Sequence, residues 1–205
     1  MNNTRIRIAI FASGSGTNAE AIIHRSLQSD AAFTVACVIS NRKDAGALKR
    51  AALFNIPAEY CNPADFATET QYVEALQQLL DQYGVQMIVL AGYLRKIPPA
   101  IIERYRGRIF NIHPALLPKF GGKGMYGRRV HQAVLQAGEA ETGITIHEVT
   151  EEYDAGPILL QKSIPINKED TPERLEMRIK AIEHQVYPEF IQQKAMEFQK
   201  LQTVQ

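Results

Sequence analysis

An asparagine and a histidine stand two positions apart in residues 109–118, Ile-Phe-Asn-Ile-His-Pro-Ala-Leu-Leu-Pro. On an extended strand, Asn111 and His113 project from the same face, because successive side chains point to opposite faces. Pro114 keeps His113 extended and lacks a backbone donor, so we expect the strand to run out into a loop here. Together the amide and the imidazole could stabilise an oxyanion and move a proton. For an isolated Asn-x-His, a strand cap is the simpler interpretation.

A glycine-rich turn follows the first apolar stretch, residues 5–11. Its sequence over residues 13–18 is Ser-Gly-Ser-Gly-Thr-Asn, and a helical stretch follows from residue 19 to 27. Strand, glycine turn and helix together predict an anion site built from backbone N–H groups and a helix N-terminus. The turn lacks the third glycine of a dinucleotide fingerprint and the Gly-Lys-Ser/Thr end of a Walker loop. We therefore predict phosphate binding without a dinucleotide, with a tight capped turn as the alternative.

The elements that must position these groups alternate along the chain. Apolar stretches predict strands at residues 5–11, 33–40, 56–60, 87–91, 108–113, 141–149 and 158–166. Helical patterns fall between most of them, with a long helix over 65–83 and a last helix that Thr171 and Pro172 begin. This alternation predicts an α/β fold with a doubly wound, mostly parallel sheet, helices on both faces and a single domain over residues 1–205. Ligands bind beyond the carboxyl ends of such strands.

Composition narrows the class of function. The chain has 23 lysines and arginines against 22 aspartates and glutamates, so its net charge does not favour nucleic acid or another polyanion as a partner. Its two cysteines, Cys37 and Cys61, lie in apolar surroundings and resemble buried thiols. The absence of a long uncharged apolar run argues against a membrane segment, and we expect a cytoplasmic protein. Nucleophile elbows and metal-ligand spacings are absent from the sequence, which favours non-covalent, metal-free group transfer.

The other four histidines indicate a catalytic site less specifically than His113 does. His24 and His131 fall in predicted helices and are interpreted as surface or capping groups. For His147, in a predicted strand, a structural and a catalytic role stay open. His184 is expected to pack the last helix. Only His113 has other chemically suited residues around it.

Three motifs resemble those of the folate-dependent formyltransferases. Residues 111–118 closely resemble the family's catalytic motif, and Asp154-Ala155-Gly156-Pro157 looks like its catalytic aspartate loop. Residues 13–18 are similar to the phosphate loop of the branch that acts in purine biosynthesis. The resemblance extends from the first strand to the last helix. Three motifs in the right order make it highly specific, whereas each alone is weak.

The resemblance implies direct transfer of a formyl group from 10-formyltetrahydrofolate to the amine of glycinamide ribonucleotide, in de novo purine biosynthesis. His113 would act as a general acid, and Asn111 would help it to stabilise the tetrahedral intermediate. Asp154 would keep the imidazole protonated and help to orient a water. The family uses small-molecule substrates, and we expect a monomer or homodimer. The order of substrate binding stays open.

The resemblance also assigns binding residues. Gly16, Thr17 and Asn18 would bind the ribonucleotide phosphate. Asn111 would contact the folate, whose pocket would otherwise be lined, largely through backbone, by Leu94, Arg95, Lys96 and Ile97. Glu183 matches a residue that contacts the glycinamide end, with a solvated helix face as an equal alternative.

Departures from the family pattern leave alternatives open. The loop over residues 119–128 is longer than usual, and residues 68–71 lack the arginine that some relatives use for the folate glutamate tail. A formyltetrahydrofolate deformylase would share the histidine and aspartate but normally has an extra N-terminal domain. A tRNA-directed formyltransferase would need a further C-terminal domain. A non-catalytic nucleotide-binding module would need only the glycine turn.

Overall fold

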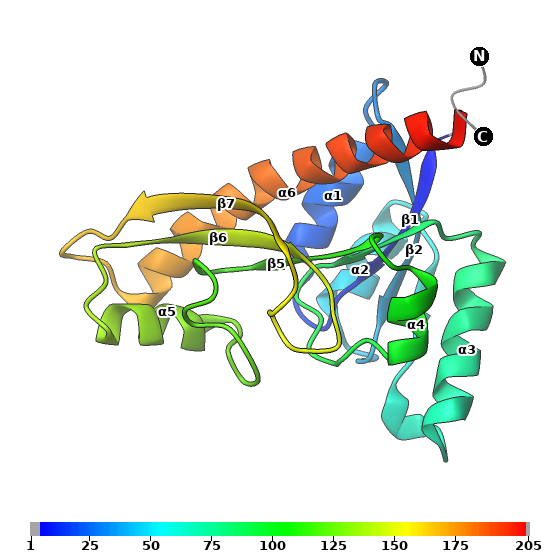
Figure 1. Cartoon of the computed structure of the whole chain (residues 1–205), viewed down its shortest axis with the longest axis horizontal. Helices are drawn as coiled ribbons and strands as arrows, with labels where there is room; N and C mark the ends of the chain where they lie inside the picture. The colour runs from blue at the N-terminus through cyan, green and yellow to red at the C-terminus, as the bar shows by residue number, and fades with distance from the viewer. Residues whose placement is uncertain (1–4, 204–205) are drawn as a thin grey trace.

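The strands of this computed structural model, which describes residues 5–203, form one seven-stranded sheet (Figure 1). The strand order is β3-β2-β1-β4-β5-β6-β7. The strands are β1 (Ile6–Phe11), β2 (Phe33–Ser40), β3 (Ala58–Tyr60), β4 (Met87–Leu90), β5 (Ile109–His113), β6 (Glu141–Glu148) and β7 (Ile158–Pro165). The first five run parallel, and β6 and β7 continue the sheet antiparallel. The predicted mostly parallel α/β sheet is confirmed.

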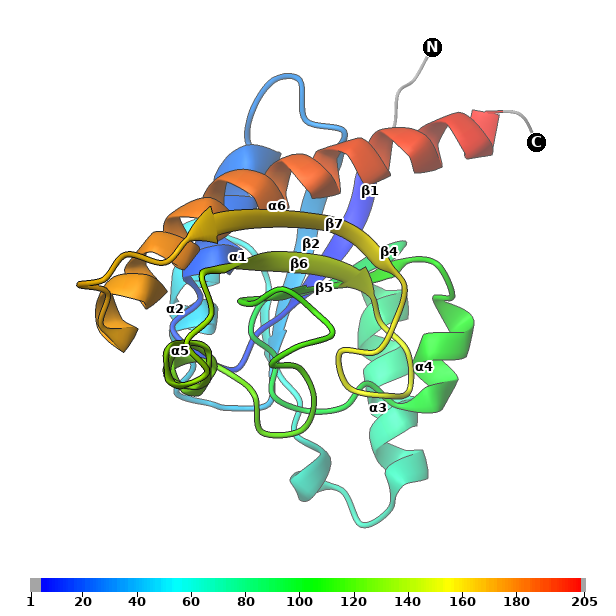
Figure 2. The same cartoon turned by 60° about the vertical axis from the view of Figure 1, so that its left-hand side comes forward.

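Helices cover both faces of this sheet, as the alternating pattern predicts (Figure 2). One face packs against α1 (Thr17–Ser26), α2 (Gly46–Leu53), α5 (Arg128–Gln136) and α6 (Pro172–Thr203). The other face packs against α3 (Glu69–Gln82) and α4 (Pro99–Arg104). Within β1, Ile8 and Ile10 enter the first core, and Ala9 and Phe11 enter the second. Both sides of the strand are buried, which is why its sequence is almost continuously apolar.

The long helix predicted over residues 65–83 begins later than expected. A short 3₁₀ turn, η1 (Pro63–Asp65), is followed by an extended segment, and α3 begins at Glu69. Thr68 caps α3, because its hydroxyl accepts a hydrogen bond from the backbone N–H of Gln71 at 3.2 Å. The cap interrupts what the hydrophobic periodicity alone presents as one helix.

The last helix, α6, crosses the first face of the sheet and lies beside α1 (Figure 1). Thr171 caps its N-terminus through a 3.3 Å bond from the N–H of Arg174, as predicted. Tyr187 is fully buried, and its hydroxyl reaches the carbonyl oxygens of Leu90 at 3.0 Å and Phe110 at 2.9 Å. The helix is thereby fixed to the carboxyl end of β4 and to the start of β5, two strands that lead to the predicted site.

Candidate active site

A cavity of about 560 Å³ opens at the carboxyl ends of β1, β4 and β5. The three predicted motifs meet there, although they lie far apart in the sequence. Predicted site residues that line the cavity are Gly16, Thr17, Asn18, Leu94, Arg95, Asn111, His113, Asp154 and Glu183. The other two, Lys96 and Ile97, line an adjoining hollow of about 70 Å³ together with Asn111 and Asp154. All of the predicted residues therefore fall in one continuous region.

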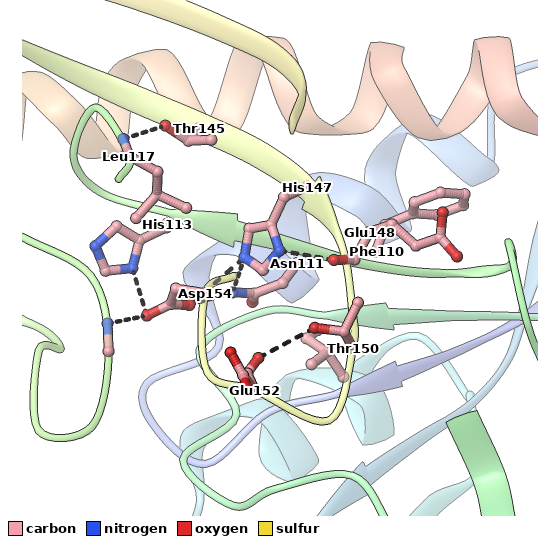
Figure 3. A network of polar contacts seen from close by, with 12 residues as sticks. Phe110, Asn111, His113, Leu117, Thr145, His147, Glu148, Thr150, Glu152 and Asp154 are labelled. Carbon is pink, nitrogen blue, oxygen red and sulfur yellow. Dashed lines mark hydrogen bonds and ion pairs between the residues drawn. The ribbon is translucent and has the colours of Figure 1, made fainter. Parts of the chain in front are cut away.

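His113 is the last residue of β5, and two groups contact its ring, of which Figure 3 shows Asp154. Its Nε2 lies 2.8 Å from the carbonyl oxygen of Phe120, which can only accept a hydrogen bond, so Nε2 carries a proton. Its Nδ1 lies 3.5 Å from Oδ2 of Asp154. The backbone N–H of Gly122 donates to the same carboxylate oxygen at 2.9 Å. The loop after β5 therefore orients both His113 and its carboxylate partner.

The pKa of His113 lies below its ordinary value of 6.5. Burial is the largest cause, since the ring is 3% exposed and its charged form would lose hydration. The charge of Asp154 and the carbonyl of Phe120 raise the pKa by less, and His147 lowers it further. Asp154 therefore acts in the predicted direction, but burial outweighs it in the free protein, so the net shift of the pKa favours the neutral ring. With Nε2 bonded to Phe120, Nδ1 is the ring nitrogen that faces Asp154.

Asp154 remains a carboxylate in this buried position. Burial opposes its ionisation, but its contacts with His147 and His113 and the hydrogen bond from the N–H of Gly122 together hold its pKa below 3.8. Its backbone adopts a left-handed conformation, with φ at 54°, which aspartate tolerates better than most residues. The turn thereby directs one carboxylate towards two histidines.

His147 positions the side chain of Asn111 (Figure 3). The sequence alone left a structural and a catalytic role open for this histidine. The two residues are direct partners in the antiparallel pairing of β5 and β6. Nδ1 of His147 donates to the carbonyl of Glu148 at 2.9 Å, which leaves Nε2 to accept the Asn111 amide at 3.1 Å. The same amide nitrogen lies 3.4 Å from Oδ1 of Asp154. The two hydrogens of this amide are thus directed at His147 and, at the longer distance, at Asp154.

The glycine turn ends at the N-terminus of α1. Gly16 has φ at 80°, and a Cβ atom there would lie 2.4 Å from Cα of Ala47, so only glycine fits. No side chain caps α1 at Gly16. Its first backbone N–H groups are thus available beside the cavity, as an anion site requires.

One face of α6 lines the cavity next to the turn, where Asn18 is hydrogen-bonded to Glu183. Glu176, Ile179, Lys180 and Glu183 line the cavity, at the spacing i, i+3, i+4 and i+7 of a single helical face. Lys180 was missed in the sequence, although its spacing from Glu183 could have identified it. Its ammonium lies 2.6 Å from Glu176 and contributes positive charge on the side of the glycine turn.

Glu183 is buried, at 6% exposure, so the alternative of a solvated helix face is wrong. Burial raises its pKa to about 7, against the lowering effect of a 2.9 Å hydrogen bond from Nδ2 of Asn18. Oδ1 of Asn18 is buried and has no partner within residues 5–203. A buried acceptor that lines a cavity is suited to a hydroxyl or amine of a ligand.

His131 is also buried, at 2% exposure, and lines the cavity from α5, so its interpretation as a surface group is wrong. Burial lowers its pKa to about 4 and keeps the ring neutral. Its Nδ1 has no partner among the described residues. The sequence offered a signal: Val130, His131 and Val134 lie on one face of the helix.

Across residues 5–203, groups of three or more histidine, cysteine, aspartate or glutamate side chains placed to hold a metal are absent. Every helix there is too short or too polar to cross a membrane.

Comparisons with known proteins show which family this chain resembles. The sequence model of the formyl transferase family matches residues 6–191. A phosphoribosylglycinamide formyltransferase of Haemophilus influenzae is 40% identical over 182 residues, which cover 89% of this chain and 84% of that protein. A chloroplastic phosphoribosylglycinamide formyltransferase of Arabidopsis thaliana is 40% identical over 192 residues, which cover 91% of this chain. The match spans 64% of that longer relative.

Solved structures of formyltransferases also resemble this chain. The phosphoribosylglycinamide formyltransferase of Coxiella burnetii, solved in complex with CHES, superposes with a TM-score of 0.86 at 41% identity. The match covers 95% of this chain and 89% of that one. With a family model over most of its length and close relatives in sequence and structure, the chain belongs to the formyl transferase family.

Proposed function

We propose that the chain transfers the formyl group of 10-formyltetrahydrofolate to the amine of glycinamide ribonucleotide, a step of de novo purine biosynthesis. The observation that carries this proposal is a single cavity that joins the anion-binding turn to Asn111, His113 and Asp154. The relatives named phosphoribosylglycinamide formyltransferase support the same substrates. A phosphate at one end and a reacting amine at the other match this arrangement.

The ribonucleotide occupies the half of the cavity between α1 and α6. Its phosphate binds the backbone of Gly16, Thr17 and Asn18, with Lys180 supplying positive charge. Glu183 and the partnerless Oδ1 of Asn18 accept hydrogen bonds from the sugar and glycinamide portion.

The folate occupies the half of the site formed by the segment after β4. Backbone groups of this segment and the Asn111 side chain bind the pterin, and the segment comprises Leu94, Arg95, Lys96 and Ile97. Arg95 and Lys96 are exposed at the mouth, where an acidic tail would lie. The ammonium of Lys96 lies 5.3 Å from the ring centre of Tyr153, which holds it beside the opening.

The chemistry follows from the protonation states. The amine nitrogen attacks the formyl carbon, and Nδ1 of neutral His113 takes up the proton that the amine loses. The Asn111 amide hydrogen that is directed at Asp154 at 3.4 Å in the free protein turns to the oxyanion and stabilises it. The imidazolium formed is balanced by the Asp154 carboxylate and then returns its proton to N10 of the folate as the carbon–N10 bond breaks. His113 thus acts as a base first and as an acid second.

Two other functions use the same residues differently. A deformylase would activate water in place of the amine and would release formate without a ribonucleotide. A non-catalytic module would use only the turn. The buried carboxyl of Glu183, and the ammonium of Lys180 in the same cavity, favour a ribonucleotide. The contacts among Asn111, His147, His113 and Asp154 favour catalysis.

One experiment separates these functions. The protein is mixed with 10-formyltetrahydrofolate, and loss of the formyl group is followed with and without glycinamide ribonucleotide. We expect loss only when the ribonucleotide is present. Loss without it would identify a hydrolase, and no loss in either mixture would indicate a non-catalytic module.

We propose that residues 1–205 form a single catalytic domain, which works in the cytoplasm as a monomer or homodimer. The reaction needs neither a metal nor nucleic acid. The nearly balanced net charge argues against nucleic acid as a partner. The two buried free thiols are consistent with the reducing environment of the cytoplasm. The Arabidopsis relative is named chloroplastic, so the compartment is a separate question from the activity. Gel filtration at micromolar concentration distinguishes the two oligomeric states.

A further inference from the structure

Ser13 joins three loops at the edge of the sheet through one buried hydroxyl. The residue is 1% exposed and lies two positions after the end of β1. Its Oγ lies 2.5 Å from Oδ1 of Asn41, just after β2, and 2.9 Å from the backbone nitrogen of Leu94, after β4. Because an amide oxygen only accepts and an N–H only donates, the hydroxyl donates to Asn41 and accepts from Leu94. Its backbone N–H also donates to Gly92 at 3.0 Å.

Neither Ser13 nor Asn41 lines the cavity. We propose that Ser13 is a positioning residue, which fixes the folate-binding segment at Leu94 relative to the ribonucleotide-binding turn. This inference rests on the proposed function. Reacting atoms must approach to about 3–3.5 Å, so the spacing of the two substrate sites has to be held closely. One side chain that belongs to the first loop and binds the second sets that spacing.

The two loops depend on Ser13 unequally. The glycine turn has further anchors in α2, since the carbonyl of Gly14 accepts from the N–H of Ala47 at 3.2 Å. The carbonyl of Ser15 accepts from Nε of Arg50 at 2.9 Å. The N–H of Leu94, by contrast, is bound by the Ser13 hydroxyl itself. Removing that hydroxyl should therefore disturb folate binding and leave ribonucleotide binding nearly unchanged.

Asn41 has an indirect part. By accepting the hydroxyl hydrogen of Ser13, it turns a lone pair of Oγ towards Leu94. Asn41 is itself 7% exposed, so water does not readily replace it. Loss of Asn41 should weaken folate binding in the same direction as loss of the Ser13 hydroxyl, by a smaller factor.

A purely structural role for Ser13 is the competing explanation, and Ser26 provides a matched control. Ser26 is 4% exposed, and its hydroxyl donates to the carbonyl of Ile23 at 2.7 Å inside α1. Ser26→Ala removes a buried serine hydroxyl as Ser13→Ala does, without touching either substrate loop.

The test compares wild type, Ser13→Ala, Asn41→Ala and Ser26→Ala. Steady-state kinetics give KM for each substrate, calorimetry gives Kd for the product tetrahydrofolate, and thermal unfolding gives Tm. For Ser13→Ala we expect KM for 10-formyltetrahydrofolate and Kd for tetrahydrofolate to rise about tenfold, roughly the effect of one lost hydrogen bond. KM for glycinamide ribonucleotide should stay within about twofold. Ser26→Ala should lower Tm and leave both KM values unchanged.

An unchanged folate KM, or an equal rise in both KM values, in Ser13→Ala would overturn the inference. The same split in Ser26→Ala would also overturn it. If Ser13→Ala does not fold, Asn41→Ala decides, because its folate constants must rise. A wild-type protein without ribonucleotide-dependent transfer would reject the proposed function instead. Tetrahydrofolate calorimetry would then still test Ser13, since binding needs no turnover.

Discussion

At the residue scale, burial opposes the charge of both Asp154 and His113, with different outcomes. The pKa of Asp154 stays below 3.8 because its contacts with His147, His113 and Gly122 outweigh burial, whereas the pKa of His113 falls below 6.5 because burial outweighs the Asp154 carboxylate. A neutral histidine beside a charged aspartate is ready to accept a proton and to hold it briefly. That is the order of steps which formyl transfer to an amine requires.

Removing either partner should therefore affect turnover far more than binding. We expect His113→Ala and Asp154→Asn each to lower kcat by about 10²–10⁴-fold, with Kd for tetrahydrofolate within a few fold. Asparagine is the appropriate replacement for Asp154, since it also tolerates the left-handed backbone at φ 54°. Rapid-quench and calorimetric measurements check the two quantities. Full activity in both variants would rule out the mechanism.

The protonation of His113 can be measured directly. In an NMR titration of the free protein, its ring should titrate below pH 6.5. Asp154→Asn should move that midpoint to lower pH, because the carboxylate is a raising influence that the amide lacks. His131 should titrate near pH 4 in both proteins and serves as an internal reference. A midpoint for His113 that rises in the variant would contradict this account.

At the element scale, the contact between α1 and α6 contains a titrating group. The pKa of Glu183 is about 7 in the folded protein against 4.5 when free, so the fold favours its neutral form. Its contribution to stability is fully present below pH 4.5 and is lost as the pH rises through about 7. The loss at pH 8 amounts to roughly 2–3 kcal/mol.

Glu183→Gln should remove this loss, since glutamine stays neutral and can still accept from Asn18. We expect the urea midpoint of the variant to exceed that of wild type at pH 8 by more than it does at pH 5. Glu169→Gln, whose side chain is 90% exposed, is the control and should show the same difference at both values. Parallel pH dependence in wild type and Glu183→Gln would show that the carboxyl group is not the cause.

The elements also show what the sequence could and could not predict. Strands were recognisable because parallel strands buried on both faces are continuously apolar, and the site motifs follow those strands. The pairing of Asn111 with His147 depends on the antiparallel register of β5 and β6, which local patterns do not encode. The burial of His131 and Glu183 arises where α5 and α6 meet the cavity, so the polarity of these residues alone suggested exposure. The pKa of His113 required its burial as well as its neighbours.

At the scale of the whole molecule, α6 ties the parallel half of the sheet to the site. The hydroxyl of Tyr187 reaches Leu90 at the carboxyl end of β4 and Phe110 at the start of β5, the strand that carries Asn111. Tyr187→Phe should lower the free energy of unfolding by about 1–3 kcal/mol, because two buried carbonyls lose a donor. Urea denaturation measures this change.

Tyr60→Phe is the control for that measurement, as Tyr60 is only half-buried on the edge strand β3. It should change the unfolding free energy by less than about 0.5 kcal/mol. Equal effects of the two substitutions would mean that the hydroxyl of Tyr187 does not hold the helix to the sheet.

The loop after β5 has a consequence for how this enzyme can diversify. Its carbonyl at Phe120 and its N–H at Gly122 hold His113 and Asp154, and both anchors precede residues 123–127. Those later residues line the cavity without binding either catalytic group. Insertions and deletions confined to 123–127 therefore alter which acceptor amines fit, while the reacting groups keep their places. New acceptor specificities are accessible to evolution, or to a loop library, without reconstruction of the catalytic centre.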